Sequence, residues 1–314
     1  MITLALILLL AFRQVAEVPE IAPGVHLLAG AFVPGSQPDG NTVFLETPKG
    51  LVVVDTGRHR AHVQQIAEFA RAAKQPVVTI VNTHWHLDHV GGNAFLRESF
   101  PGVRVLASDA IKEARTGFLA NYREQLEGLL KTASDPRSRE GFAAELALID
   151  QGAKLEPDEI VREAGRRSLG GRDVEIGFER HAVTAGDVWL FEPKSRVLIA
   201  GDLVTLPAPF LDTACPARWR ESLDRLAAVN FTRLVPGHGQ PMSRAGFDSY
   251  RKAFGNLLAC GASDRPKQEC ISGWLKDVAT LVPEKEEAFT RSLMDYYVDV
   301  LRGDPAQIAR RCGK

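Results

Sequence analysis

Residues 83–89, Thr-His-Trp-His-Leu-Asp-His, place three histidines and one aspartate within six positions. They directly follow the apolar run 77–81, which is typical of a buried strand. At strand spacing His84 and His86 point the same way, whereas Asp88 and His89 lie beyond the following turn. Imidazole and carboxylate are the ligands that zinc and similar metal ions accept. This density indicates a site for more than one metal ion, rather than isolated loop or core histidines.

Further short motifs accompany this stretch. Gly-Gly-Asn follows it at 91–93, Val-Val-Val-Asp-Thr-Gly lies at 52–57, Ala-Gly-Asp at 200–202 and Pro-Gly-His-Gly at 236–239. Each piece alone is weak, but in this order they resemble the signature of the metallo-β-lactamase-fold hydrolases. The resemblance runs from about residue 24 to about residue 242. It implies an enzyme that hydrolyses its substrate with the help of metal ions.

The resemblance also implies which residues bind metal. His84 and His86 would hold the first ion, and Asp88 and His89 the second. Asp88 would in addition be catalytic, because a carboxylate at that position can accept and release a proton during the reaction.

Two ligands come from the second half of the chain. Asp202 ends the apolar run 197–201 and would bridge both ions and share the catalytic role, although an aspartate there can also simply cap a turn. His238 lies between two glycines that let the backbone approach closely, and it would bind the second ion. An ordinary loop histidine is the alternative for His238.

The third ligand of the first ion departs from the family pattern. The family has His-Thr before a glycine and a hydrophobic strand, whereas this chain contains His-Ala-Val-Thr-Ala-Gly-Asp at 181–187. If Thr184 is aligned with the threonine of the family motif, Val183 occupies the ligand position and His181 lies two residues earlier. We predict that a slightly longer loop brings His181 to the first ion. Otherwise the first ion is weakly held, or the centre holds one ion only.

Asp55, which ends the run 51–55, is a candidate for orienting a ligand histidine. A carboxylate that accepts a hydrogen bond from the imidazole fixes its tautomer. A turn aspartate at a strand end is the alternative. Trp85 points away from the ligands on strand alternation and is expected in the core.

Apolar segments joined by turns predict the sheets. Strands are expected at 24–28, 41–46, 51–55, 174–176, 188–191, 197–200 and 233–235. Helical spacing of apolar residues predicts helices at 61–74 and 217–229. Strands and helices that alternate in two similar halves predict an α/β (α+β) fold, a four-layer αββα sandwich, which the resemblance also implies.

We predict one main domain, residues 17–250, with a helical insertion at about 109–168 and a C-terminal helical extension, residues 251–314. The insertion is charged and rich in Ala and Leu, and Asp135-Pro136 breaks it. It either caps the metal site and selects the substrate or only shields the sheet edge.

Residues 1–12 form an apolar run that is short for a membrane span and about right for a signal peptide. We therefore predict a signal peptide at 1–16 and a periplasmic or secreted mature chain without a membrane span. No Lys or Arg precedes the run and the cleavage site at 14–16 is poor, which argues against export. An uncleaved segment would be an N-terminal membrane anchor.

The composition is that of a globular protein with a full core: 314 residues, 45% hydrophobic and 25% charged. A net charge of −1 gives no electrostatic basis for nucleic-acid binding. The expected partner is a small-molecule substrate, and the sequence carries no signal for the oligomeric state.

None of the four cysteines lies in a Cys-x-x-Cys pair, which argues against a cysteine zinc site. Cys260 and Cys270 bracket a polar loop and would form a disulfide in an oxidising compartment. Cys215 and Cys312 are left as a second pair. In a reducing compartment all four would be thiols.

The predicted reaction is hydrolysis of a small ester, thioester or lactam, with a metal-bound hydroxide attacking the carbonyl carbon. Two zinc ions per chain are expected, with one zinc or one iron ion as the alternative. Zinc β-lactamases of the family usually have Cys or Ser at the bridging position, so Asp202 makes the chain more similar to thioester, lactone and phosphodiester hydrolases. The segment 206–213 resembles poorly assigned periplasmic members, including some linked with quinoprotein dehydrogenase systems.

Two other classes of function compete with hydrolysis, and a β-lactamase remains an alternative within it. Some members of the family hold a single iron ion through two histidines and the bridging aspartate, and they are oxidoreductases of the persulfide dioxygenase type. A non-catalytic metal-binding accessory protein of a periplasmic redox system is the third possibility. Metal identity separates the first two, because zinc supports only hydrolysis whereas iron supports dioxygen chemistry.

Overall fold

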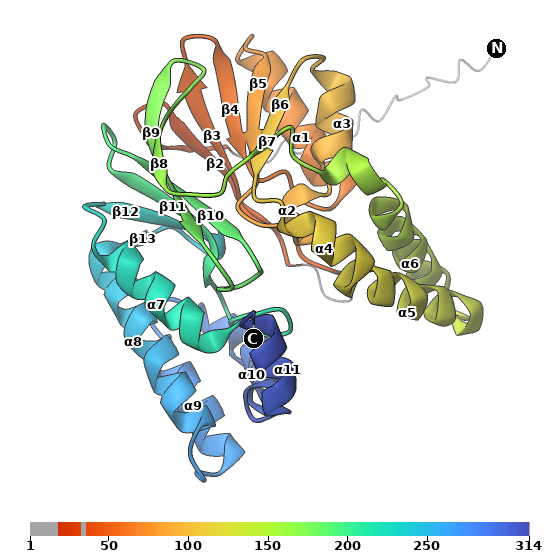
Figure 1. The fold of residues 1–314 in the computed structure, drawn as a ribbon, viewed down its shortest axis with the longest axis vertical. Coiled ribbons are helices and arrows are strands. Elements are labelled where there is room, and N and C mark those ends of the chain that lie inside the picture. The colour runs from red at the N-terminus through yellow and green to blue at the C-terminus, as the bar shows by residue number, and fades with distance from the viewer. Residues whose placement is uncertain (1–17, 33–35, 314) are drawn as a thin grey trace, which may run out of the picture.

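The computed structural model of the chain describes residues 18–32 and 36–313, so the segment predicted as signal peptide or anchor, 1–16, lies outside the described residues. Two mixed sheets pack face to face, and helices cover their outer surfaces (Figure 1). This is the predicted αββα sandwich, with helices at the C-terminal end of the chain.

The first sheet has the simple strand order β1-β2-β3-β4-β5-β6-β7. Its strands are β1 (Glu20–Ala22), β2 (Val25–Leu28), β3 (Thr42–Thr47), β4 (Gly50–Val54), β5 (Val77–Val81), β6 (Arg104–Ala107) and β7 (Glu159–Ile160). Pairing is antiparallel from β1 to β4 and parallel from β4 to β7. The parallel pairs make the carboxyl ends of β4 and β5 meet at one edge of the sheet.

The second sheet has the order β13-β12-β11-β10-β9-β8. Its strands are β8 (Gly165–Leu169), β9 (Arg172–Glu179), β10 (Asp187–Glu192), β11 (Val197–Thr205), β12 (Arg233–His238) and β13 (Met242–Ser243). Only β11 and β12 are parallel, so their carboxyl ends also meet at one edge.

Three apolar layers hold the sandwich together. Between the sheets, residues such as Val52 and Val54 from β4 face Val188 and Leu190 from β10. Outside the first sheet lie α1 (Arg60–Ala72) and α3 (Asn93–Ser99), and outside the second lie α7 (Pro216–Ala227) and α8 (Arg244–Gly261). Burying a side chain such as Ile66 on α1 contributes about 1.5–3 kcal/mol, so these layers stabilise the packing of the sheets and helices.

The insertion is helical only up to residue 155. It contains α4 (Ala110–Thr116), α5 (Phe118–Thr132), α6 (Pro136–Ile149) and the 3-10 turn Gly152–Leu155. Asp135 caps α6 by accepting a hydrogen bond from the amide of Ser138 (2.8 Å), and Pro136 occupies its first position. The prediction of helix up to about 168 is wrong at its end, because β7 pairs with β6 and β8 pairs with β9 across the turn at Gly170 and Gly171.

The C-terminal extension is helical and packs against α8 on the outer side of the second sheet. It comprises the end of α8, then α9 (Lys267–Asp277), the 3-10 turn Glu284–Glu286, α10 (Glu287–Leu301) and α11 (Pro305–Arg311). The boundary drawn at residue 250 falls inside α8, which continues because Phe247, Tyr250 and Phe254 all face the same core. Among the described residues, no helix is both long and apolar enough to cross a membrane.

Both cysteine pairs are disulfides. Cys260 joins Cys270, which links the end of α8 to α9. Cys215 joins Cys312 across 97 residues and ties the end of α11 to the start of α7. The second bond holds the C-terminal end of the chain next to the segment that precedes α7.

Candidate metal centre

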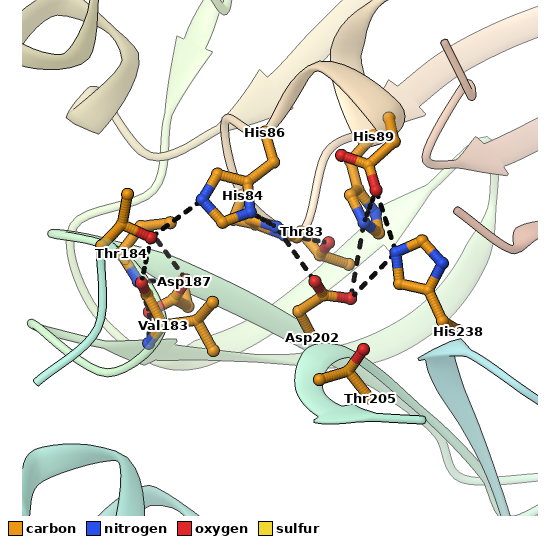
Figure 2. A network of polar contacts seen from close by, with 12 residues as sticks. Thr83, His84, His86, His89, Val183, Thr184, Asp187, Asp202, Thr205 and His238 are labelled. Carbon is orange, nitrogen blue, oxygen red and sulfur yellow. Dashed lines mark hydrogen bonds and ion pairs between the residues drawn. The ribbon is translucent and has the colours of Figure 1, made fainter. Parts of the chain in front are cut away.

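Six buried histidine and aspartate side chains meet at the edge where β5, β11 and β12 end or bend (Figure 2). Their ligand atoms form two groups, within which the atoms lie no more than 4.8 Å apart. The groups are His84, His86 and Asp202, and Asp88, His89 and His238. The loop after β5 carries the first two histidines, and α2 (Leu87–Val90) carries the next two ligands. The structure thus brings together six of the seven predicted ligands.

Asp202 lies between the two groups. Its Oδ2 atom is 3.7 Å from Nε2 of His84 in the first group. Its Oδ1 atom is 3.4 Å from Nε2 of His89 and 3.7 Å from Nε2 of His238 in the second. One oxygen faces each side, which is the arrangement that a bridging carboxylate needs.

A bulge and a glycine create this approach. The register between β11 and β12 shifts at Gly201, whose φ is +53°. Asp202 therefore lies at a bulge inside β11 and not at a strand end as the sequence indicated. On β12, a Cβ at Gly237 would lie only 1.9 Å from Oδ1 of Asp202. Any side chain at this position would displace Asp202 or the neighbouring His238.

Asp55 orients one histidine from each group, the role predicted for it. Its Oδ2 atom lies 2.7 Å from Nδ1 of His89 and accepts a hydrogen bond of 2.7 Å from the hydroxyl of Thr83. The hydroxyl of Thr83 has one proton, which it donates to Asp55. Oγ1 of Thr83 therefore accepts a hydrogen bond from Nδ1 of His84, 3.0 Å away. In the neutral form of both rings, Nε2 is thereby the nitrogen without a proton, and it faces into the centre.

His86 is oriented by Thr213, a residue that no sequence motif indicated. The hydroxyl of Thr213 donates to the carbonyl oxygen of Val183 (2.9 Å) and lies 2.9 Å from Nε2 of His86. The single hydroxyl proton is used on the carbonyl, so Thr213 accepts a hydrogen bond from Nε2 of His86. Nδ1 of His86 is therefore the nitrogen available to a metal ion.

The structure does not bring His181 to this centre. The residue lies in the loop between β9 and β10 with φ +54°, and its Nδ1 atom is 3.2 Å from the carbonyl oxygen of Arg311. A Cβ at Gly313 would lie 2.7 Å from Nε2 of His181, so the ring packs against the C-terminal end of the chain. The loop thus turns His181 toward α11, while the backbone oxygen of Val183 accepts a hydrogen bond from Thr213.

The chemistry of the donor atoms fits bound cations. Nε2 of His84 and Nδ1 of His86 both carry lone pairs, and they face each other at 2.9 Å. Two such nitrogens repel each other unless a cation lies between them. In the described part of the chain, Nε2 of His89 and Oδ1 of Asp202 are buried without a hydrogen bond. Their separation of 3.4 Å is what an ion about 2.1 Å from each atom would leave.

The electrostatics of the centre favour cations as well. Burial lowers the pKa of His86 to about 4 and lowers the pKa of His84 well below its ordinary value, so both imidazoles are neutral at pH 7. Burial alone would also lower the pKa of His89, but three neighbouring carboxylates outweigh it and raise that pKa well above 6.5. The negative charge around His89 therefore stabilises either a proton on the ring or a metal ion in its place.

A buried ion-pair chain connects the insertion to Asp88. NH2 of Arg58 lies 3.4 Å from Oδ1 of Asp88, and NH1 of Arg58 pairs closely with Glu145 on α6. The hydroxyl of Tyr122 donates to Glu145 over 3.2 Å. The sequence offered no signal for Glu145, and only its place just after the Asp-Thr-Gly turn distinguished Arg58. These contacts link the insertion to Asp88 through Arg58.

Comparisons with known proteins agree with this fold. The sequence model of the Metallo-beta-lactamase superfamily matches residues 36–238, a range that contains all six clustered side chains. Among solved structures, a metallo-beta-lactamase from Pontibacter korlensis superposes with a TM-score of 0.57 at 22% identity, over 76% of this chain and 99% of that one.

Curated relatives have several activities. The linear primary-alkylsulfatase of Pseudomonas sp. (strain ATCC 19151) is 28% identical over 221 residues, which is 63% of this chain and 41% of that protein. An atrochrysone carboxyl ACP thioesterase of Aspergillus fumigatus is 35% identical over 29% of this chain and 31% of its own length. The metallo-beta-lactamase IND-1 of Chryseobacterium indologenes is 22% identical over 71% of this chain and 81% of its own. The match thus spans less than half the length of the first two relatives.

Proposed function

Because this chain belongs to the metallo-β-lactamase superfamily, we propose that it is a metal-dependent hydrolase with two ions at the six-residue centre. Zinc is the proposed metal, since imidazole and carboxylate form the whole donor set. The observation that carries the proposal is the convergence of lone pairs. Hydrogen bonds outside the centre use one nitrogen each of His84, His86 and His89, and their other nitrogens face inward.

When bound, divalent ions polarise the scissile group and lower the pKa of a water molecule to about 7. The protein contributes position and proton handling. Oδ2 of Asp88 lies 2.9 Å from Nε2 of His238, and its other oxygen is held by Arg58. Burial would raise the pKa of Asp88, but His89 and its other neighbours hold it well below 3.8. Its carboxylate is therefore ionised and placed to receive a proton during hydrolysis.

The two ion sites are unequal. The second group has Asp88, His89 and His238, with Asp202 as a fourth ligand, whereas the first has only His84, His86 and Asp202. We propose that the second site fills first and that the first ion is bound more weakly. A stepwise loss of zinc during titration with a chelator supports this order, and simultaneous loss of both ions contradicts it.

The proposed substrate is a small ester, thioester or lactam. The relatives named for sulfate-ester and thioester hydrolysis favour an ester or thioester, and Asp202 at the bridging position distinguishes the chain from zinc β-lactamases. The specific compound is left to a substrate panel that includes carboxylic, thio- and sulfate esters together with a β-lactam.

The test compares zinc-loaded protein, protein stripped with a chelator, and two matched variants. His238→Ala removes a clustered imidazole, whereas His181→Ala removes one that faces α11. We expect hydrolysis by the loaded protein and by His181→Ala, but not by the stripped protein or by His238→Ala. Turnover that survives both metal removal and Asp88→Ala would show that the centre is not hydrolytic.

A mononuclear iron oxidoreductase is the second candidate, and one observation favours it. His84, His86 and Asp202 form a set of two histidines and one carboxylate, the donor set of many non-haem iron oxygenases. One iron ion per chain, with oxygen consumption in the presence of a persulfide, would replace the hydrolase proposal.

We also propose that the mature chain works in an oxidising compartment, in the periplasm or outside the cell. The two disulfides support this location, because such bonds are rare in reducing compartments. Protein isolated from its native compartment and denatured without reductant should show no free thiols, whereas four thiols per chain would place it in a reducing one.

A further inference from the structure

Exposed aromatic side chains concentrate around the metal centre. Among the described residues, five large apolar side chains are exposed: Phe32 (41%), Phe118 (39%), Leu129 (48%), Phe289 (45%) and Tyr296 (53%). Single exposed apolar residues are common on protein surfaces, but connected ones mark binding sites. All of these except Leu129 are connected by ring contacts to a ligand histidine.

The first connection starts at His238. The ring of Phe32 lies 5.3 Å from the imidazole of His238, measured between ring centroids. The ring of Phe289, on α10, lies 5.8 Å from that of Phe32 in an edge-on arrangement. Two half-exposed aromatic rings from opposite ends of the chain therefore adjoin one imidazole of the second group.

Two more connections start at His86. The ring of Phe210 lies 4.9 Å from that of His86, and Tyr297 lies 6.0 Å from Phe210. Tyr296 then contacts Tyr297 at 5.2 Å and extends this series to the surface. On another side, Trp85 lies 4.6 Å from His86.

The insertion provides the last ring. Phe118, at the start of α5, lies 5.5 Å from Trp85. The exposed aromatic residues thus come from the loop before β3, from the insertion and from the C-terminal extension.

We propose that the substrate of this centre is amphiphilic. Its hydrolysable polar group reaches the six ligands, and its uncharged apolar body, an alkyl chain or an aromatic ring, lies against Phe32, Phe289 and Phe210. This inference rests on the proposed hydrolase function for the identity of the polar group. The apolar contact itself is a binding property and is measurable without turnover.

The test measures the binding of straight-chain carboxylates to the zinc-loaded full chain by calorimetry, below their micelle concentrations. Butanoate, hexanoate, octanoate and decanoate share one headgroup and differ only in apolar length. We expect two- to fourfold tighter binding for each added methylene, where fourfold corresponds to about 0.8 kcal/mol per buried CH₂. 4-Phenylbutanoate, compared with octanoate, shows whether a ring or a chain is preferred.

Matched variants assign the effect to the proposed residues. Phe32→Ala and Phe289→Ala should each flatten the dependence on chain length, whereas Leu129→Ala removes an equally exposed side chain on α5 and should not change it. Affinities that do not depend on chain length would overturn the inference. So would variants whose only effect is to dissociate an oligomer, because the rings would then be an interface between chains.

The two proposals fail in different ways. If longer carboxylates bind more tightly but no ester, thioester or lactam is hydrolysed, the apolar site stands and the hydrolase proposal is wrong. If small esters are hydrolysed but affinity is independent of chain length, the hydrolase proposal stands and the amphiphilic substrate is wrong.

Discussion

The carboxylate of Asp55 lies 2.7 Å from Nδ1 of His89, and through Thr83 it also fixes the ring of His84. One side chain outside the ligand set thus determines the tautomers of one histidine from each ion site. Asp55 adopts φ +61°, a conformation that aspartate and asparagine tolerate better than most residues. The strand β4 ends there, so the backbone turn itself directs this carboxylate toward the ligands.

Asp55→Asn should weaken zinc binding at both sites, because an amide replaces the carboxylate that orients both rings. Loss of an outer hydrogen-bond partner costs about 10- to 100-fold in metal affinity. Competition with a chromophoric chelator measures the change, and circular dichroism confirms that the fold survives. Unchanged affinity for both ions would show that the ligands are oriented by other contacts.

Thr213→Val should weaken only the first ion, since Thr213 contacts His86 and no ligand of the second site. Without the hydroxyl, Nε2 of His86 loses its acceptor and the ring can rotate. We expect about a tenfold loss of affinity in the weaker step of the zinc titration. Thr213→Ser keeps the hydroxyl and should restore the step, a rescue that a purely steric role of the threonine does not predict.

His181→Ala should leave the metal content unchanged. Its ring contacts the carbonyl of Arg311 and lies against Gly313, away from the clustered side chains. Elemental analysis of this variant beside His238→Ala gives the comparison. Loss of one ion in His181→Ala would restore it as the third ligand of the first ion.

Arg58→Met should destabilise the fold by about 3–5 kcal/mol, because it leaves Glu145 buried without its partner. When Glu145→Gln is added to Arg58→Met, part of the lost free energy of unfolding should be recovered. Glu145→Gln alone, in the wild-type chain, should lower the free energy of unfolding. Urea unfolding of the four proteins measures the coupling. Additive effects would mean that the ion pair does not connect the insertion to the centre.

The two disulfides should differ in their contribution to stability. Cys215–Cys312 spans 97 residues and Cys260–Cys270 spans 10. On chain entropy alone, the longer loop is worth about 2 kcal/mol more. Denaturant unfolding of Cys215→Ser/Cys312→Ser beside Cys260→Ser/Cys270→Ser checks the order. A larger loss from the short loop would point to strain or to structure in the unfolded chain.

The parts of the molecule that the sequence predicted well are those with local causes. Alternating or continuous apolar residues indicated the strands, and helical spacing indicated α1 and α7. The density of ligands at 84–89 indicated the metal centre, because four such groups rarely follow one strand by chance. The break in the insertion that Asp135-Pro136 indicated is local in the same way, and α6 begins there.

The parts that the sequence did not predict depend on contacts between distant residues. His181 and Val183 are two positions apart, and only the packing of α11 against the loop shows which way the ring turns. Thr213 reaches His86 across 127 residues, and Glu145 reaches Arg58 across 87. The end of the insertion forms strands because β6 and β9 offer partners, which no property of residues 159–168 alone reveals.

The most direct test of the account is the metal content of the full chain, purified without added metal and measured by elemental analysis before and after equilibration with zinc. Two zinc ions per chain after equilibration, with the first site emptying before the second under chelator, is the predicted result. A protein that retains no zinc, or that holds a single iron ion and takes up no second metal, would contradict a two-ion hydrolytic centre.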